Sequence, residues 1–126
     1  MNDQIAQGFN DWADRILSEQ PLEVAAYNFN LYEHDRSFAI QLIGATHFDS
    51  DDPSWACDEA FSSGEDLFEI PHEIAGSDWH DGLATAKQLI TYYVSVGAQR
   101  EKLRVAQGIG VGFVDGDIEL LQMHDV

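Results

Sequence analysis

The chain has 126 residues, of which 23 are acidic and only six are Lys or Arg, so its formal net charge is −17 at pH 7. This length suits one domain over residues 1–126, and a hydrophobic share of 44% argues against intrinsic disorder. The charge excludes general electrostatic binding to nucleic-acid phosphates or to an anionic membrane, and a single cysteine, Cys57, excludes an internal disulfide.

The first part of the sequence predicts a helix followed by a β-hairpin. Apolar residues recur every three or four positions over residues 2–19, which is typical of an amphipathic helix that ends before Pro21. Alternating apolar and polar residues over 24–33 predict a strand, and the apolar stretch over 38–47 predicts a second one. The short polar segment between them suits a hairpin turn.

The middle of the chain is irregular and acidic. Residues 49–54 predict a loop, residues 53–61 predict one short helical turn, and residues 66–70 predict a short strand that Pro71 closes. No regular period is visible elsewhere between Phe48 and Gly64.

Residues 77–96 predict the second long helix. Ser77 or Asp78 supplies its N-terminal cap, and Gly97 is expected to end it in the left-handed conformation. Its core-facing stripe is predicted to contain Trp79, Leu83, Ala86, Ile90 and either Tyr93 or Val94. A further helical turn is expected over residues 99–105.

The last part of the sequence predicts another hairpin. Residues 109–114 and 118–122 are apolar runs that flank Asp115 and Gly116, and Asp-Gly at positive φ is a strong turn signal. Because the strands come in hairpins, we expect an α+β fold with an antiparallel sheet built from two hairpins and helices packed on one face.

Three alternating glycines, Gly108, Gly110 and Gly112, precede that turn. They do not form a dinucleotide-binding fingerprint, because the spacing is Gly-x-Gly-x-Gly and a strand, not a helix, contains them. The alternation removes side chains from one face of the strand. It predicts that a helix, or Trp and Tyr rings, packs closely over that face.

Carboxylates of the second hairpin suggest a cation site. Asp115, Asp117 and Glu119 alternate and could hold Mg²⁺ or Ca²⁺ on one face. Asp-Gly-Asp is also what a tight turn uses, and we favour the turn, although the sequence leaves cation binding open. The chain has no histidine ligand pair and no nucleophile motif. We therefore predict no catalytic residues, no bound metal and no cofactor.

The distribution of charge points to a protein partner. From Ser37 to Ala86 the chain contains eleven Asp and Glu residues and no Lys or Arg, with aromatic residues interspersed. Aromatic anchors surrounded by steering charges are typical of protein-binding patches, which is the interpretation we favour; the alternative is that the rings fill a core beneath an acidic loop. The predicted partner-binding residues are Asp49, Asp51, Asp52, Trp55, Asp58, Glu59, Glu65 and Asp66.

Two short motifs carry a resemblance to a known class of proteins. Asp-Pro-Ser-Trp-Ala-Cys-Asp (52–58) and Gly-Phe-Val-Asp-Gly-Asp (112–117), in a small acidic α+β chain, resemble the immunity proteins of bacterial polymorphic toxin systems, including contact-dependent growth inhibition. The resemblance implies a protein that is not an enzyme. It implies binding to a toxin, often a basic nuclease, through acidic loops that cover the active site or an adjacent surface.

Three hypotheses follow for function. The first is an immunity-type inhibitor whose acidic segment binds a basic toxin domain. The second is an acidic mimic of nucleic acid that sequesters another protein, and the third is a small enzyme with a carboxylate-bound metal.

The N-terminal residues lack the pattern of a signal peptide, so we expect a soluble cytoplasmic protein. The sequence leaves open whether it forms a homodimer.

Overall fold

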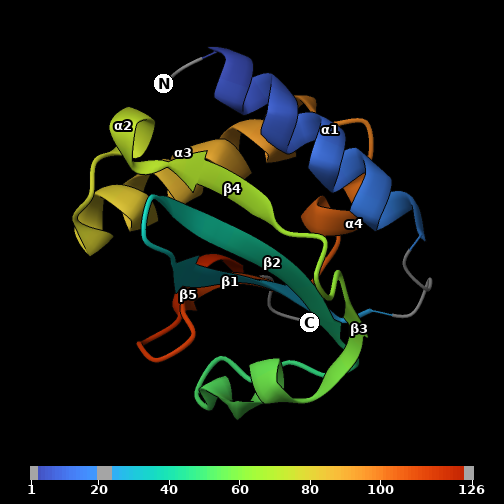
Figure 1. The fold of residues 1–126 in the computed structure, drawn as a ribbon. Helices are drawn as coiled ribbons and strands as arrows, with labels where there is room; N and C mark the ends of the chain where they lie inside the picture. The colour runs from blue at the N-terminus through green and yellow to red at the C-terminus, as the bar shows by residue number, and fades with distance from the viewer. Residues whose placement is uncertain (1–2, 20–23, 124–126) are drawn as a thin grey trace.

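Six strands form one mixed sheet, and the helices cover one of its faces (Figure 1). The structure is a computed structural model, and it describes residues 3–19 and 24–123. The elements in chain order are α1 (Asp3–Glu19), β1 (Ala26–Glu33), β2 (Ser37–Ala45), the 3₁₀ turn η1 (Pro53–Cys57), β3 (Glu59–Ser62), β4 (Phe68–Pro71), α2 (His72–Ala75), α3 (Trp79–Val96), α4 (Arg100–Arg104), β5 (Gly108–Phe113) and β6 (Glu119–Met123).

The predicted α+β class is confirmed, and the sheet is largely antiparallel. Its strand order is β3-β2-β1-β5-β6, and β4 pairs with the other end of the β2 edge that β3 occupies. The two predicted hairpins are β1–β2 and β5–β6. They are joined by a parallel pairing of β1 with β5, which the local sequence pattern did not predict because α3 and α4 lie between the two hairpins.

The hydrophobic core lies between the sheet and the helices. Alternate residues of β1, Tyr27, Phe29 and Leu31, face α1 and α3 and are fully or almost fully buried there. The intervening residues of β1 face the opposite side of the sheet, where Ala26 joins a second, small cluster with Trp55. The sheet therefore has one fully apolar face and one face that is partly polar, and the candidate site lies on the second.

The glycine-bearing strand β5 is closely covered, but not by the groups that were expected. A Cβ atom at Gly108 would lie 2.3 Å from the Phe48 ring, and one at Gly112 would lie 2.3 Å from the backbone oxygen of Asp117. No helix and no Trp or Tyr ring takes this place among the described residues. Instead, the Phe48 ring packs over Gly108, and the β5–β6 turn (residues 114–118) folds back over the strand, so that at Gly112 its backbone approaches the backbone of β5.

The predicted N-terminal cap of α3 is confirmed, whereas the predicted conformation of Gly97 at its C-terminal end is wrong. Asp78 is the N-terminal cap, since its carboxylate accepts the backbone N–H of His80 at 2.8 Å. Gly97 does not adopt the left-handed conformation; its φ is −65°. Glycine is needed there because a Cβ atom would lie 2.3 Å from the Tyr93 ring, which packs against it.

Two further predictions need correction. Trp79 is half exposed instead of facing the core, because it is the first residue of α3 and lies at the rim of the sheet. Gly116 has no positive φ, since the β5–β6 turn is longer than a two-residue hairpin loop and begins with a hydrogen bond from the Gly116 N–H to the Phe113 carbonyl. The strand β3 and the single-turn helix α2 were not predicted.

A hydrogen-bond cluster around Tyr93 joins α1 to the connection between α3 and α4. The Tyr93 hydroxyl donates to Asp14 Oδ1 at 2.5 Å and accepts the backbone N–H of Gln99 at 3.1 Å. Asp14 also accepts the N–H of Ala98. Burial, together with the hydrogen bond to Asp14, raises the pKa of Tyr93 above its ordinary value. The protonated hydroxyl therefore stabilises the folded state.

Tyr93→Phe is expected to lower the free energy of unfolding by about 1–3 kcal/mol, because it leaves the Gln99 N–H without its acceptor and removes one of the two hydrogen bonds that Asp14 Oδ1 accepts. A group whose pKa is raised on folding stabilises the protein below its ordinary pKa, about 10 for tyrosine, and this contribution is lost as the pH rises. The stability of the wild-type protein should therefore fall more steeply above pH ~10 than that of the variant. Urea unfolding across this pH range measures both effects. Tyr92→Phe, on the exposed face of α3, is the matched control and should change neither.

Candidate partner-binding surface

The acidic loop (residues 49–59) lies below the sheet, on the side opposite to the helices (Figure 1). Its turns are built by its own carboxylates: Asp49 accepts the N–H of Asp51 at 2.9 Å, and Asp52 accepts the N–H of Ser54 at 3.0 Å and so caps η1. The second bond holds the pKa of Asp52 below its ordinary value. Asp52 is therefore ionised at neutral pH while it caps η1.

The predicted contact residues of this loop divide into two kinds. All five carboxylates are exposed, and Asp58 lies 3.4 Å from the ring of His47. Trp55 is only 2% exposed and packs against Phe48 with 5.2 Å between the ring centroids. The prediction of Trp55 as a partner-binding anchor is therefore corrected: it is the core residue that holds the acidic loop against the sheet.

The two remaining predicted residues lie apart from the acidic loop, in the segment that leads to β4. Asp66 binds Arg15 of α1 at 2.9 Å, and its backbone oxygen accepts the indole N–H of Trp12 at 3.0 Å. Glu65 is exposed beside it. Asp66 thus fastens the chain to the helix layer, and the structure does not bring all eight predicted residues onto one surface.

A polar hollow of about 630 Å³ lies between the acidic loop and the β5–β6 turn. Its floor is a row of amide side chains, in which Asn28 donates to Asn30 and Asn30 donates to Gln41. Tyr32 also donates to Gln41. We call this floor, formed by Asn28, Asn30, Tyr32 and Gln41, the amide row. Glu59 lies on one wall of the hollow and Asp117 on the other.

The amide row ends in a buried acceptor. Asn28 is 1% exposed, and its Oδ1 has no hydrogen-bond partner among the described residues. It lies against Gly110 and Ile118, since a Cβ atom at Gly110 would be 2.5 Å from this oxygen and 2.7 Å from Ile118 Cγ2. The sequence analysis did not predict this row. The pattern that could have revealed it is the spacing of Asn28 and Asn30, which lie two residues apart on a strand and therefore on the same face.

A second groove, of about 730 Å³, lies on the other side of the β5–β6 turn. Trp79 at the start of α3 forms one wall, and Phe113 and Val114 form another, with 6.4 Å between the Trp79 and Phe113 rings. Carboxylates at its edge come from Glu33, Asp115 and Asp117. We call this the Trp79 groove. The sequence reasoning missed it because Trp79 was assigned to the core stripe of α3.

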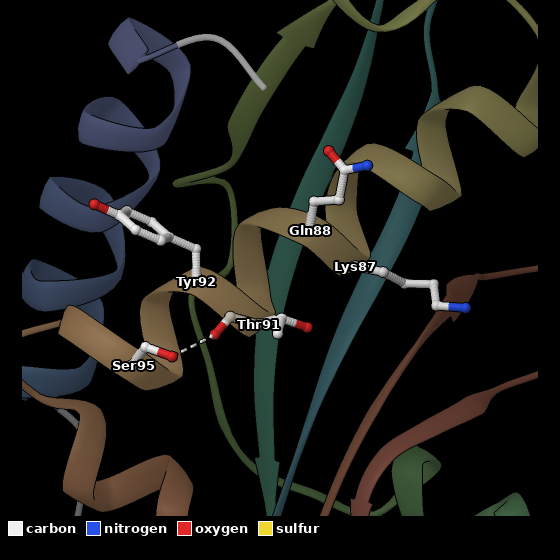
Figure 2. A pocket seen from close by; sticks show the side chains of 5 residues that line it. All are labelled: Lys87, Gln88, Thr91, Tyr92 and Ser95. Carbon is white, nitrogen blue, oxygen red and sulfur yellow. Dashed lines mark hydrogen bonds between the residues drawn. The ribbon is translucent and has the colours of Figure 1, made fainter.

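A third hollow lies on the exposed face of α3 (Figure 2) and offers no comparable arrangement. Figure 2 shows that Tyr92, Gln88 and Lys87 point away from one another, and the only hydrogen bond drawn joins the Ser95 hydroxyl to the Thr91 backbone oxygen. Lys87 is paired with Glu119 of β6 at 3.1 Å. All the residues that line this hollow belong to α3, so it is a space between side chains on the surface of one helix.

The possible cation site on the second hairpin does not form. Among the described residues, no three His, Cys, Asp or Glu side chains come together in a way that would hold a metal ion. Glu119 turns to Lys87, whereas Asp115 and Asp117 border the Trp79 groove. The Asp-Gly-Asp motif therefore belongs to a turn.

No family model, no curated protein and no solved structure matches this chain significantly. Within the described part of the chain, no helix has the length and apolar character needed to cross a membrane. The arguments about function therefore come from the chain's own residues and their arrangement.

Proposed function

We propose that this chain is a cytoplasmic binding protein that neutralises a basic bacterial toxin domain by covering its active or substrate-binding surface. The observation that carries the proposal is an asymmetry of charge across the fold. Five of the six basic residues lie in the helices of one layer: Arg15, Lys87, Arg100, Lys102 and Arg104. The acidic loop on the opposite side of the sheet belongs to the long stretch, Ser37 to Ala86, that has no Lys or Arg at all.

This asymmetry gives the molecule an electrostatically directed face. A partner with a basic surface is attracted more strongly to the side of the acidic loop than to the helix layer, where most of the Lys and Arg residues lie. This preference for one orientation raises the rate of productive encounters. Ordinary solvated surfaces interleave both signs of charge, because unrelieved like charges destabilise the folded state. The carboxylates of the acidic loop repel one another in the free protein. A basic partner that neutralises them would account for the persistence of this unfavourable arrangement.

The proposed mechanism is competition for the toxin's basic residues. A nuclease uses Lys and Arg to bind phosphate groups, and the carboxylates of the acidic loop offer those cations an alternative set of charge-assisted hydrogen bonds. The loop can form these bonds without unfolding, since Asp52 caps η1 with one carboxylate oxygen and Trp55 anchors the loop from beneath. Substrate is then excluded because its binding surface is covered.

Growth rescue tests this proposal. The C-terminal domain encoded by the gene next to that of this chain is produced in a bacterial host, alone and together with the chain. We expect the domain alone to stop growth, the chain to restore growth, and the two to purify as a stable complex. A domain that does not inhibit growth, or one that inhibits it equally when the folded chain is present in excess, would overturn the proposal.

A further inference from the structure

The Trp79 groove combines an accessible aromatic ring with a rim of negative charge. Trp79 is 50% exposed and Val114 is 53% exposed, so the groove presents a substantial apolar surface to solvent. Tryptophan is highly buried on average in folded proteins, because burying its large apolar surface stabilises the fold. Exposed tryptophans are characteristic of the residues that dominate protein–protein binding energy.

The charge of the groove selects one kind of occupant. Glu33, Asp115 and Asp117 line it, and no Lys or Arg is among its lining residues. The one histidine in its lining, His34, lies 3.5 Å from Glu69, which is outside the groove. A cationic side chain therefore finds three carboxylates and an aromatic ring, while an acidic or purely apolar segment is disfavoured by the rim.

The shape of the ring site favours arginine over lysine. One face of the Trp79 indole stacks on the His80 ring, with 3.5 Å between the centroids, and the indole makes an edge contact with Phe113. A planar guanidinium can stack on an aromatic ring and at the same time donate two parallel hydrogen bonds to a carboxylate, which an ammonium group cannot do. The apolar walls supplied by Phe113 and Val114 suit a neighbouring apolar side chain.

We propose that the Trp79 groove binds an arginine side chain, followed or preceded by an apolar residue, on a basic segment of the partner protein. This inference rests on the proposed function, because it names the anchor by which the same partner is held. The Trp79 groove and the polar hollow above the amide row lie on either side of the β5–β6 turn, and residues of that turn line both. One partner can therefore contact the acidic loop and the groove together.

Tryptophan fluorescence tests the groove directly. Trp12 and Trp55 are 3% and 2% exposed, so quenching by acrylamide reports almost entirely on Trp79. The probe is the blocked peptide acetyl-Gly-Leu-Arg-Phe-Gly-amide, and its matched control replaces arginine by the uncharged isostere citrulline. We expect the arginine peptide to reduce the quenching constant at least twofold at saturation, and the citrulline peptide to need at least tenfold higher concentration for the same effect. Equal protection by both peptides, or protection by neither, would overturn the inference.

Variants of the rim identify the site and separate the two proposals. Asp115→Asn with Asp117→Asn should weaken the arginine peptide at least tenfold, whereas Glu73→Gln with Glu101→Gln, on the surface of α2 and α4, should not. If the arginine peptide protects Trp79 but the chain does not rescue growth, the proposed function is wrong and the groove inference stands. If the chain rescues growth but Trp79→Ala binds the toxin domain as tightly as the wild-type chain, the groove inference is wrong and the proposed function stands.

Discussion

Neutralising four carboxylates of the acidic loop is expected to weaken binding of the toxin domain about a thousandfold or more, with little change in stability. The substitutions are Asp51→Asn, Asp52→Asn, Asp58→Asn and Glu59→Gln. Loss of one member of a desolvated charge pair costs roughly 2–5 kcal/mol, largely because the partner's charge remains buried and unpaired. Two such pairs among the four are sufficient for the expected loss.

The fold should tolerate these changes for local reasons. Asparagine caps a helix about as well as aspartate, so Asp52→Asn retains the hydrogen bond to the Ser54 N–H. The contact between Asp58 and His47 is exposed and adds little. Removal of four like charges also reduces repulsion within the loop.

A matched control removes the same charge from the helix side. It carries Asp3→Asn, Asp11→Asn, Glu19→Gln and Glu73→Gln, all at exposed positions. Calorimetric titration of both variants with a catalytically inactive toxin domain, accompanied by thermal melts, measures the difference. Equal affinity of the two variants would contradict the assignment of the acidic loop to the interface.

Gly110→Val is expected to lower the free energy of unfolding by about 3 kcal/mol, at the upper end of what overpacking usually costs. The new Cβ atom would lie 2.5 Å from Asn28 Oδ1 and 2.7 Å from Ile118 Cγ2, and neither neighbour is the free end of a long flexible chain. Displacing Asn28 would also disturb the amide row, whose hydrogen bonds form one directed chain.

Gly116→Val provides the comparison for that variant. The nearest atoms to a Cβ at Gly116 are 3.7 Å and 3.8 Å away, which is ordinary contact, and its backbone has no positive φ. Its stability in urea should remain close to that of the wild-type protein. If Gly110→Val were equally stable, the β5–β6 turn would not pack over the glycine-bearing strand as described.

Local sequence patterns predicted those elements whose own residues decide them. The stripe of α1 and the cap of α3 at Asp78 depend on neighbours within a few positions, and both appear in the structure. The pairing of β1 with β5 depends on segments about 80 residues apart, so no local pattern could reveal it. The strand β3 is too short and too polar to show a period of its own.

The candidate site was predicted less completely than the fold. The distribution of charge along the sequence identified the acidic loop, because it can be read without knowledge of the fold. The role of Trp55 depends on whether its ring points to solvent or beneath the loop, and only the packing against Phe48 decides this. Trp79 has the opposite outcome: the helical period placed it on the core stripe of α3, but its side chain is 50% exposed and meets the sheet only through an edge contact with Phe113.

Hydrogen exchange of the backbone amides, measured by mass spectrometry on the free chain and on its complex with the inactive toxin domain, tests the central claim most directly. Binding on the side of the acidic loop should slow exchange in residues 49–59 and in the β5–β6 turn, residues 114–118, and should leave α1 and α4 unchanged. Slower exchange confined to α1 and α4, with the acidic loop unaffected, would place the partner on the helix layer and contradict the account.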